Sequence, residues 1–146
     1  MTRVFLAFAM LLGANAAFAQ CSFDVEVGDT LAYNVDAINV GADCAEVTIN
    51  LKHTGNLPAA AMGHNWVLTK TGDLDAVATA GMSTGLAGNY LPADDARVLA
   101  ASKIIGGGES TTLTFSTEGL SAGEAYSFFC SFPGHWSVMK GTFSIG

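Results

Sequence analysis

The stretch Cys130-Ser131-Phe132-Pro133-Gly134-His135-Trp136-Ser137-Val138-Met139 decides the fold that we expect for this chain. It offers a thiolate, an imidazole and a thioether, so a loop that follows a strand can direct all three at one point. Sulfur ligands are soft and imidazole suits copper, zinc and iron, so this set favours copper over cations that prefer oxygen. A trigonal site built on one thiolate needs a second imidazole, which must come from another part of the chain.

The segment Met62-Gly63-His64-Asn65 is the expected source of the second imidazole. His64, Cys130 and His135 would then form a His₂Cys site, with Met139 as a long axial ligand. Residues 54–69 and 126–139, which hold these side chains, contain no Asp, Glu, Lys or Arg. If the two windows meet in the fold, one end of the molecule is apolar around a metal.

Residues 1–19 have the pattern of a secretory signal peptide. Arg3 precedes an apolar run over residues 4–12, and Ala17-Phe18-Ala19 matches a cleavage signal. The apolar run is too short to span a bilayer. We therefore expect cleavage after Ala19, export to the periplasm without membrane insertion, and a single domain over residues 20–146.

The charge of the chain excludes some classes of partner. The formal net charge is −7, and loss of Arg3 with residues 1–19 makes it −8. An acidic protein of this kind is not expected to bind nucleic acid or an anionic membrane surface.

Three cysteines in an exported protein predict one disulfide and one cysteine with another role. Cys21 and Cys44 flank the first two strand-like runs, whereas Cys130 lies among the candidate ligands. We therefore expect a bond between Cys21 and Cys44. The alternatives for Cys130 are a buried apolar side chain or a bridge to another molecule.

Short alternating runs separated by turn residues predict an all-β fold. Seven or eight such strands indicate a Greek-key β-sandwich or barrel. An Ala-rich stretch from Asp73 to about Gly85 predicts one short inserted helix. The predicted strands are Ser22 to Val27, Leu31 to Tyr33 with Ala37 to Val40, Ala45 to Lys52, Asn65 to Lys70, Arg97 to Ala100, Ser110 to Phe115, Tyr126 to Ser131, and Lys140 to Ile145.

Several motifs, taken together, resemble the azurins of the cupredoxin family. They are Asn56-Leu57-Pro58, Met62-Gly63-His64-Asn65-Trp66-Val67-Leu68, Asn89-Tyr90-Leu91, Arg97-Val98, Phe128-Phe129-Cys130, Phe132-Pro133-Gly134-His135 and Met139-Lys140-Gly141-Thr142. The resemblance covers nearly all of residues 20–146, and the spacing of cysteine, histidine and methionine matches that of azurins. Trp136, Ser137 and Val138 depart from the usual azurin loop.

The resemblance implies a cupredoxin-like fold and one copper ion per chain. It assigns His64, Cys130 and His135 as strong ligands, Met139 as the weak axial ligand, and the carbonyl of Gly63 as a distant contact opposite it. It also implies the Cys21–Cys44 disulfide.

Two further residues are expected to support the ligands. Asn65, next to His64, is a candidate for hydrogen bonds that tie the two ligand segments together. The backbone N–H of Phe132 is expected to donate to the Cys130 sulfur.

The function expected from these features is electron transport between redox proteins, with copper cycling between Cu(II) and Cu(I) and His135 at the exchange edge. Four ligands leave no open position for a substrate, so we expect no enzyme activity. Partners such as c-type cytochromes or copper or haem reductases would dock on an apolar patch, and the protein would be a monomer or weak dimer. The residues expected around that patch are Leu57, Pro58, Met62, Met82, Phe132, Pro133 and Val138.

Alternatives remain at this level. Copper storage or delivery would use a labile site, and a structural zinc site would use the thiolate and imidazoles. His64 and His135 are alternatively surface histidines, and Met139 is alternatively core packing. His53 is expected to be structural, with a link between its protonation and copper left open.

Two tryptophans are predicted to differ in their surroundings. Trp66 should pack in the core, because it follows a candidate ligand in a strand. Trp136 should lie near the surface, because it follows His135 in a loop.

Overall fold

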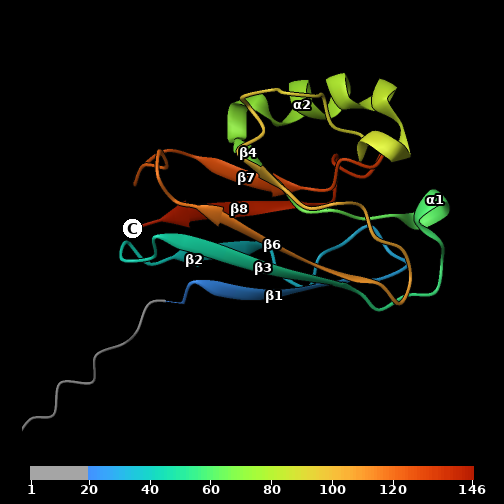
Figure 1. Ribbon diagram of the computed structural model, residues 1–146, viewed down its shortest axis with the longest axis horizontal. Helices are drawn as coiled ribbons and strands as arrows, with labels where there is room; N and C mark the ends of the chain where they lie inside the picture. Colours follow the sequence, from blue (N-terminus) through green and yellow to red (C-terminus); the bar gives the residue numbers. More distant parts are fainter. Residues whose placement is uncertain (1–19) are drawn as a thin grey trace, which may run out of the picture.

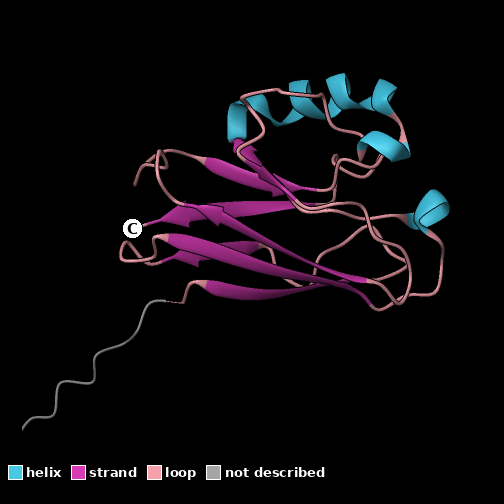
Figure 2. Cartoon of the chain, in the orientation of Figure 1, coloured by secondary structure: helices cyan, strands magenta, loops and turns pink. Residues whose placement is uncertain are grey.

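The computed structural model describes residues 20–146, so the predicted signal peptide lies outside the described residues. Within this part of the chain, eight strands form two sheets that face each other (Figure 1; Figure 2). The sheets have the orders β1-β3-β6 and β2-β8-β7-β4-β5. The strands are β1 (Ser22–Val27), β2 (Ala37–Val40), β3 (Glu46–His53), β4 (Val67–Lys70), β5 (Ala100–Ala101), β6 (Ser110–Ser116), β7 (Tyr126–Phe129) and β8 (Lys140–Ile145).

Neighbouring strands in the sheets are mostly distant in the sequence. β1 runs parallel to β3 and β2 runs parallel to β8, while the other pairs are antiparallel. Parallel neighbours cannot be joined by a tight hairpin, so the chain crosses between the two sheets. The predicted all-β cupredoxin-like sandwich is confirmed.

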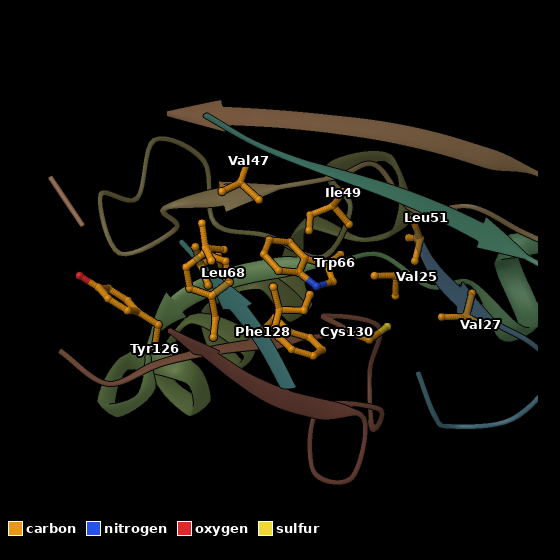
Figure 3. Close-up of a cluster of buried hydrophobic side chains, with 14 of the residues drawn as sticks. Val25, Val27, Val47, Ile49, Leu51, Trp66, Leu68, Tyr126, Phe128 and Cys130 are labelled. Carbon is orange, nitrogen blue, oxygen red and sulfur yellow. The ribbon is translucent and has the colours of Figure 1, made fainter. Parts of the chain in front are cut away.

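The core lies between the two sheets. Burial alternates along β3, where Val47, Ile49, Leu51 and His53 point inward. Trp66 is fully buried in the middle of this cluster and stacks on Phe128 at 5.5 Å between ring centroids (Figure 3). The prediction that Trp66 packs in the core is therefore confirmed.

A short helix, α2 (Leu74–Gly81), covers the outer face of the larger sheet beside β4 and β7 (Figure 1). Leu74, Val77 and Ala78 on one side of the helix pack against Val67 and Phe129. β4 and β7 are therefore buried on both faces, and Val67 and Phe129 lie at the end of these strands from which the candidate ligands extend. Three 3₁₀ turns flank the helix: η1 (Thr71–Asp73), η2 (Met82–Thr84) and η3 (Leu86–Gly88).

Three sequence predictions about elements need correction. Residues 31–33 form no strand, because only Tyr33 makes an isolated bridge, to Val27. β5 begins only at Ala100, since Asp95 and Arg97 bond to each other in a turn before it. A four-residue helix, α1 (Ala59–Met62), was not predicted; it follows Pro58, whose carbonyl accepts the N–H of Met62.

The disulfide between Cys21 and Cys44 is present, as predicted. It joins the residue before β1 to the loop before β3, and β1 and β3 are paired strands of one sheet. Over residues 20–146, the helices are all too short or too polar to cross a membrane.

Candidate metal centre

Three buried side chains from two segments converge at one end of the sandwich. His64 lies between α1 and β4, while Cys130 and His135 lie in the connection from β7 to β8. The sulfur of Cys130 is 3.7 Å from Nδ1 of His64 and 3.5 Å from Nδ1 of His135. All three donor atoms lie within 4.8 Å of one another. One ion can therefore reach all of them.

The pairing of β4 with β7 brings the two segments together. Val67 lies opposite Phe129, so the residues just before β4 and just after β7 leave the sheet at the same edge. The backbone of His64 is held separately, because its N–H and C=O both bond to Ile105, at 3.0 and 2.9 Å. The site therefore depends on the folded sheet for its geometry.

The connection between β7 and β8 closes on itself through backbone hydrogen bonds. The N–H of Met139 donates to the carbonyl of His135 at 2.8 Å, and the N–H of Cys130 donates to the carbonyl of Met139 at 3.1 Å. Gly134 has φ of +84°, a left-handed conformation that glycine adopts without strain. This tight loop places Cys130, His135 and Met139 in one turn of chain.

The orientation of His64 is set by a backbone contact on its far side. Nε2 lies 2.9 Å from the carbonyl oxygen of Gly28, which can only accept a hydrogen bond. Nε2 therefore carries the proton, and Nδ1 presents its lone pair toward Cys130. Gly63 before it has no room for a side chain, since a Cβ would overlap the carbonyl of Ala59 and the side chain of Ile104.

Burial changes the acid–base properties of the three donors. It lowers the pKa of His64 to about 4 and lowers the pKa of His135, so both imidazoles are neutral at pH 7. Burial also raises the pKa of the Cys130 thiol to about 12, against the opposing effect of the backbone N–H groups of Asn65 and Phe132. Metal binding must therefore displace the thiol proton.

The donor set fits copper. It combines two neutral imidazole nitrogens with one sulfur and includes no carboxylate, a set that suits copper and excludes magnesium or calcium. Similarity to known proteins supports the same metal. Residues 19–146 match the model of a family described as "Copper binding proteins, plastocyanin/azurin family".

The chain belongs to this family.

Individual azurins are similar along nearly their whole length. Azurin-2 of Alcaligenes xylosoxydans xylosoxydans is 53% identical over 128 residues, which cover 88% of this chain and 99% of that protein. Azurin of Achromobacter denitrificans is 51% identical over 127 residues, covering 87% and 85%. Azurin of Pseudomonas aeruginosa strain PAO1 is 47% identical over 135 residues, covering 92% and 91%.

A solved azurin structure also matches. It is the azurin Az-iso2 of the methylotroph Methylomonas sp. strain J, with a TM-score of 0.84 and 46% identity. The match covers 88% of this chain and 99% of that one. Membership of the plastocyanin/azurin family supports copper as the metal and gives no support to copper storage or to structural zinc.

The other residues predicted at the site lie close to the donors. The carbonyl oxygen of Gly63 is 3.9 Å from the Cys130 sulfur, and Met139 is buried at the end of the ligand loop. Asn65 is fully buried; its Oδ1 accepts the N–H of Ser131 and its Nδ2 donates to the Ser131 hydroxyl, both at 2.9 Å. These bonds join the residue after His64 to the residue after Cys130.

His53 and Trp136 lie outside the donor set. His53 is fully buried; its Nε2 is 3.0 Å from the carbonyl of Met62 and its Nδ1 accepts the N–H of Gly55. Its ring stacks on His64 at 5.1 Å. Trp136 is half-buried and packs against the cluster under α2, which agrees with its predicted place near the surface.

Three residues that contact the site were given no role in it from the sequence. Gly28 orients His64 through its carbonyl, the Tyr33 hydroxyl donates to the carbonyl of Asn65 at 2.5 Å, and Asn89 contacts Ser131. Every residue has a backbone carbonyl, so the role of one carbonyl cannot be recognised from the sequence. Tyr33 has the residue type of an ordinary strand position. None of the three was therefore visible in a pattern of potential ligands.

Proposed function

We propose that this chain is a periplasmic blue-copper protein that carries single electrons between redox proteins. The observation that carries the proposal is the buried convergence of His64, Cys130 and His135 in a chain of the plastocyanin/azurin family. In this proposal these three residues are the strong ligands, Met139 is the axial ligand, and the Gly63 carbonyl is a weak contact.

A copper ion held by these donors would supply the redox chemistry, taking up one electron as Cu(II) and giving it up as Cu(I). The chain keeps the donors in place during both steps. Cys130 comes from the end of a sheet strand, and His64 is held by Ile105 on its backbone and by Gly28 on its ring. Donors fixed by the fold in this way need little rearrangement when the charge of the site changes, which favours fast transfer.

His135 is the proposed edge for electron exchange. It is 5% exposed, and its ring lies against Phe132 at 4.6 Å between centroids. α1 and the β7–β8 connection lie toward the same end of the molecule, away from the C-terminus (Figure 1). Apolar side chains are exposed in or just before these segments, with Leu57 before α1 at 42% and Val138 in the β7–β8 connection at 63%.

This end supports a docking patch for redox partners. Pro58 and Pro133 are also exposed there, and Met62 and Phe132 are half-buried. Met82 is 45% exposed at the start of η2. The two windows at this end, residues 54–69 and 126–139, carry no charged side chain, and the Asp29 carboxylate that accepts the N–H of Leu57 borders them. A mainly apolar surface of this kind suits brief contact with partners such as c-type cytochromes or copper or haem reductases.

The same site argues against enzyme activity, because four protein donors around one ion leave no position for a substrate. The single domain over residues 20–146, removal of residues 1–19 and the monomer or weak dimer are part of the same proposal. Export is supported by the pattern of residues 1–19 and by the disulfide, which is typical of oxidising compartments.

The proposal is tested by the Cys130→Ser variant loaded with Cu(II). A serine hydroxyl cannot give the intense thiolate-to-copper absorption, so the blue colour should vanish while the circular dichroism of the sheet persists. A Cys21→Ser/Cys44→Ser variant serves as the control, because it removes two sulfurs but leaves the donor set, and it should remain blue. Colour that survives Cys130→Ser would overturn the ligand assignment.

A further inference from the structure

We propose that Asn89 is a positioning residue that fixes the two ligand-bearing segments relative to each other. The inference rests on the proposed copper site and assigns a role to a residue outside the donor set. Asn89 follows η3 in the long connection between α2 and β5. Its side chain contacts Ile104, next to the residue that holds the His64 backbone, and its backbone carbonyl contacts the ligand loop at Ser131.

Two short hydrogen bonds define the contact of Asn89 with its neighbours, and a longer one, from Nδ2 of Asn65 to the Asn89 carbonyl at 3.5 Å, accompanies them. The side-chain Oδ1 of Asn89 accepts the backbone N–H of Ile104 at 2.8 Å. The backbone carbonyl of Asn89 accepts the hydroxyl of Ser131 at 2.7 Å. Ile104 and Ser131 are both buried, so neither bond is easily replaced by a bond to water.

Each partner of Asn89 is adjacent to the residues that hold a ligand. Ile104 precedes Ile105, which bonds to both backbone groups of His64. Ser131 follows Cys130 directly in the chain. Asn89 therefore connects the support of the His64 backbone to the residue beside the thiolate.

The conformation of Asn89 makes both contacts possible at once. Its φ of 54° and ψ of 24° are left-handed, a region that asparagine enters more readily than most residues. Tyr90 is also left-handed, with φ of 48°. The Tyr90 ring packs edge-on against Phe132 at 5.2 Å, and Phe132 lies against His135. The pair 89–90 thus contacts the start of the ligand loop at two adjacent residues, Ser131 and Phe132.

The loss of the Asn89 side chain should loosen the site without removing a donor. The N–H of Ile104 would lose its acceptor in a buried position, which costs more than the bond itself contributes. The Ile104–Ile105 segment would then move more freely, and the His64 backbone with it. Greater freedom of one donor enlarges the rearrangement on each electron transfer.

The decisive variant is Asn89→Gly, because glycine keeps the left-handed backbone and deletes only the side-chain acceptor. The matched control is Asp94→Gly. Asp94 has φ of 53° and is exposed in the same connection, but no hydrogen bond links it to the ligand segments. Asn89→Asp serves as the rescue, since its carboxylate oxygen can accept the Ile104 N–H.

Two readouts test the inference. In copper-free protein, amide exchange at Ile104 should be about tenfold faster in Asn89→Gly, which is the loss of one hydrogen bond expressed as an equilibrium factor. In copper-loaded protein, the electron self-exchange rate should fall severalfold and the thiolate-to-copper band should shift. Asp94→Gly should match the unchanged protein in both, and Asn89→Asp should restore amide protection.

The inference is overturned if Asn89→Gly unfolds more easily but keeps the same spectrum and self-exchange rate as the unchanged protein. It is also overturned if Asp94→Gly produces the same changes. Failure of the proposed function would look different, because the unchanged protein itself would then bind copper without becoming blue.

Discussion

At the scale of single residues, backbone groups hold the donor side chains in the orientation that copper binding needs. The carbonyl of Gly28 selects the tautomer of His64, and the N–H groups of Asn65 and Phe132 face the Cys130 sulfur. Burial keeps the pKa of His64 near 4, so this imidazole is available as a ligand over most of the pH range. At acidic pH, the same low pKa should reduce the stability of the copper-free protein.

Copper-free protein should lose stability as the pH falls from about 6.5 to about 4. The unfolded chain binds a proton at His64 with an ordinary pKa of 6.5, whereas the folded chain does so only near 4. Acid therefore favours the unfolded state in this window, by about 1.4 kcal/mol for each pH unit. Urea unfolding of copper-free protein at several pH values measures the slope.

His64→Gln is the comparison for this experiment, because glutamine does not titrate. Its free energy of unfolding should fall less steeply between pH 6.5 and 4 than that of the unchanged protein. Equal slopes would show that His64 is protonated as easily in the folded chain as in the unfolded one.

At the scale of elements, the disulfide and the helix α2 stabilise the sandwich at places away from the donors. Cys21–Cys44 ties the residue before β1 to the loop before β3, and α2 buries the outer face of β4 and β7. Each should therefore contribute to stability with little effect on the colour of the copper protein.

The Cys21→Ser/Cys44→Ser variant should lose about 3 kcal/mol of unfolding free energy, because the bond closes a loop with a sequence separation of 23 residues. The visible spectrum of the copper-loaded variant should stay the same. Chemical denaturation and absorption of the same sample give both results, and a lost blue band would show that the disulfide controls the site.

Val77→Ala tests the packing of α2. Val77 is fully buried in the cluster with Val67 and Phe129, and loss of two methyl groups should cost about 2 kcal/mol. Val138→Ala is the control, since Val138 is 63% exposed and its truncation should leave the unfolding free energy nearly unchanged. Similar losses in both variants would contradict the packing described for α2.

The sequence predicted some elements well and missed others for identifiable reasons. β1 and β8 have the predicted bounds, because their alternating side chains face the core on one side only. α1 was missed because Ala-Ala-Ala-Met has no amphipathic period, although Pro58 before it is a common start signal. The run Leu31 to Tyr33 has strand-like composition, yet the Tyr33 hydroxyl bonds to Asn65 and the backbone forms only a bridge.

The donor residues of the candidate site could be predicted from the sequence better than the residues that hold them in place. The donors are rare residue types at fixed spacing, so their side chains are visible in the sequence, and the structure brings His64, Cys130 and His135 together. Gly28 acts through a backbone carbonyl, and Asn89 acts through a left-handed conformation in a turn-rich stretch. Neither a backbone carbonyl nor a single left-handed residue can be recognised as part of a site from one sequence.

At the scale of the whole molecule, the chain separates an apolar end from an acidic body. Residues 54–69 and 126–139 carry no charged side chain, while the formal net charge of the sequence is −7. The apolar end should set the contact with partners, and the acidic body should attract partners that carry positive charge.

Val138→Asp should slow electron transfer to a soluble c-type cytochrome by about tenfold, equivalent to 1.4 kcal/mol, because the new charge must be desolvated in the contact. Its reduction potential and visible spectrum should change little. Ser144→Asp adds the same charge in β8 near the C-terminus and should leave the rate nearly unchanged. Equal slowing by both variants would show that net charge, and not contact at the apolar patch, controls the rate of electron transfer.

The most direct test of the account is a reductive titration of the copper-loaded protein, followed by its visible absorption. We expect an intense thiolate-to-copper band that disappears with one electron per chain and returns fully on oxidation. A Cu(II) protein without that band, or a band that reduction does not bleach reversibly, would contradict a copper site built on Cys130, His64 and His135.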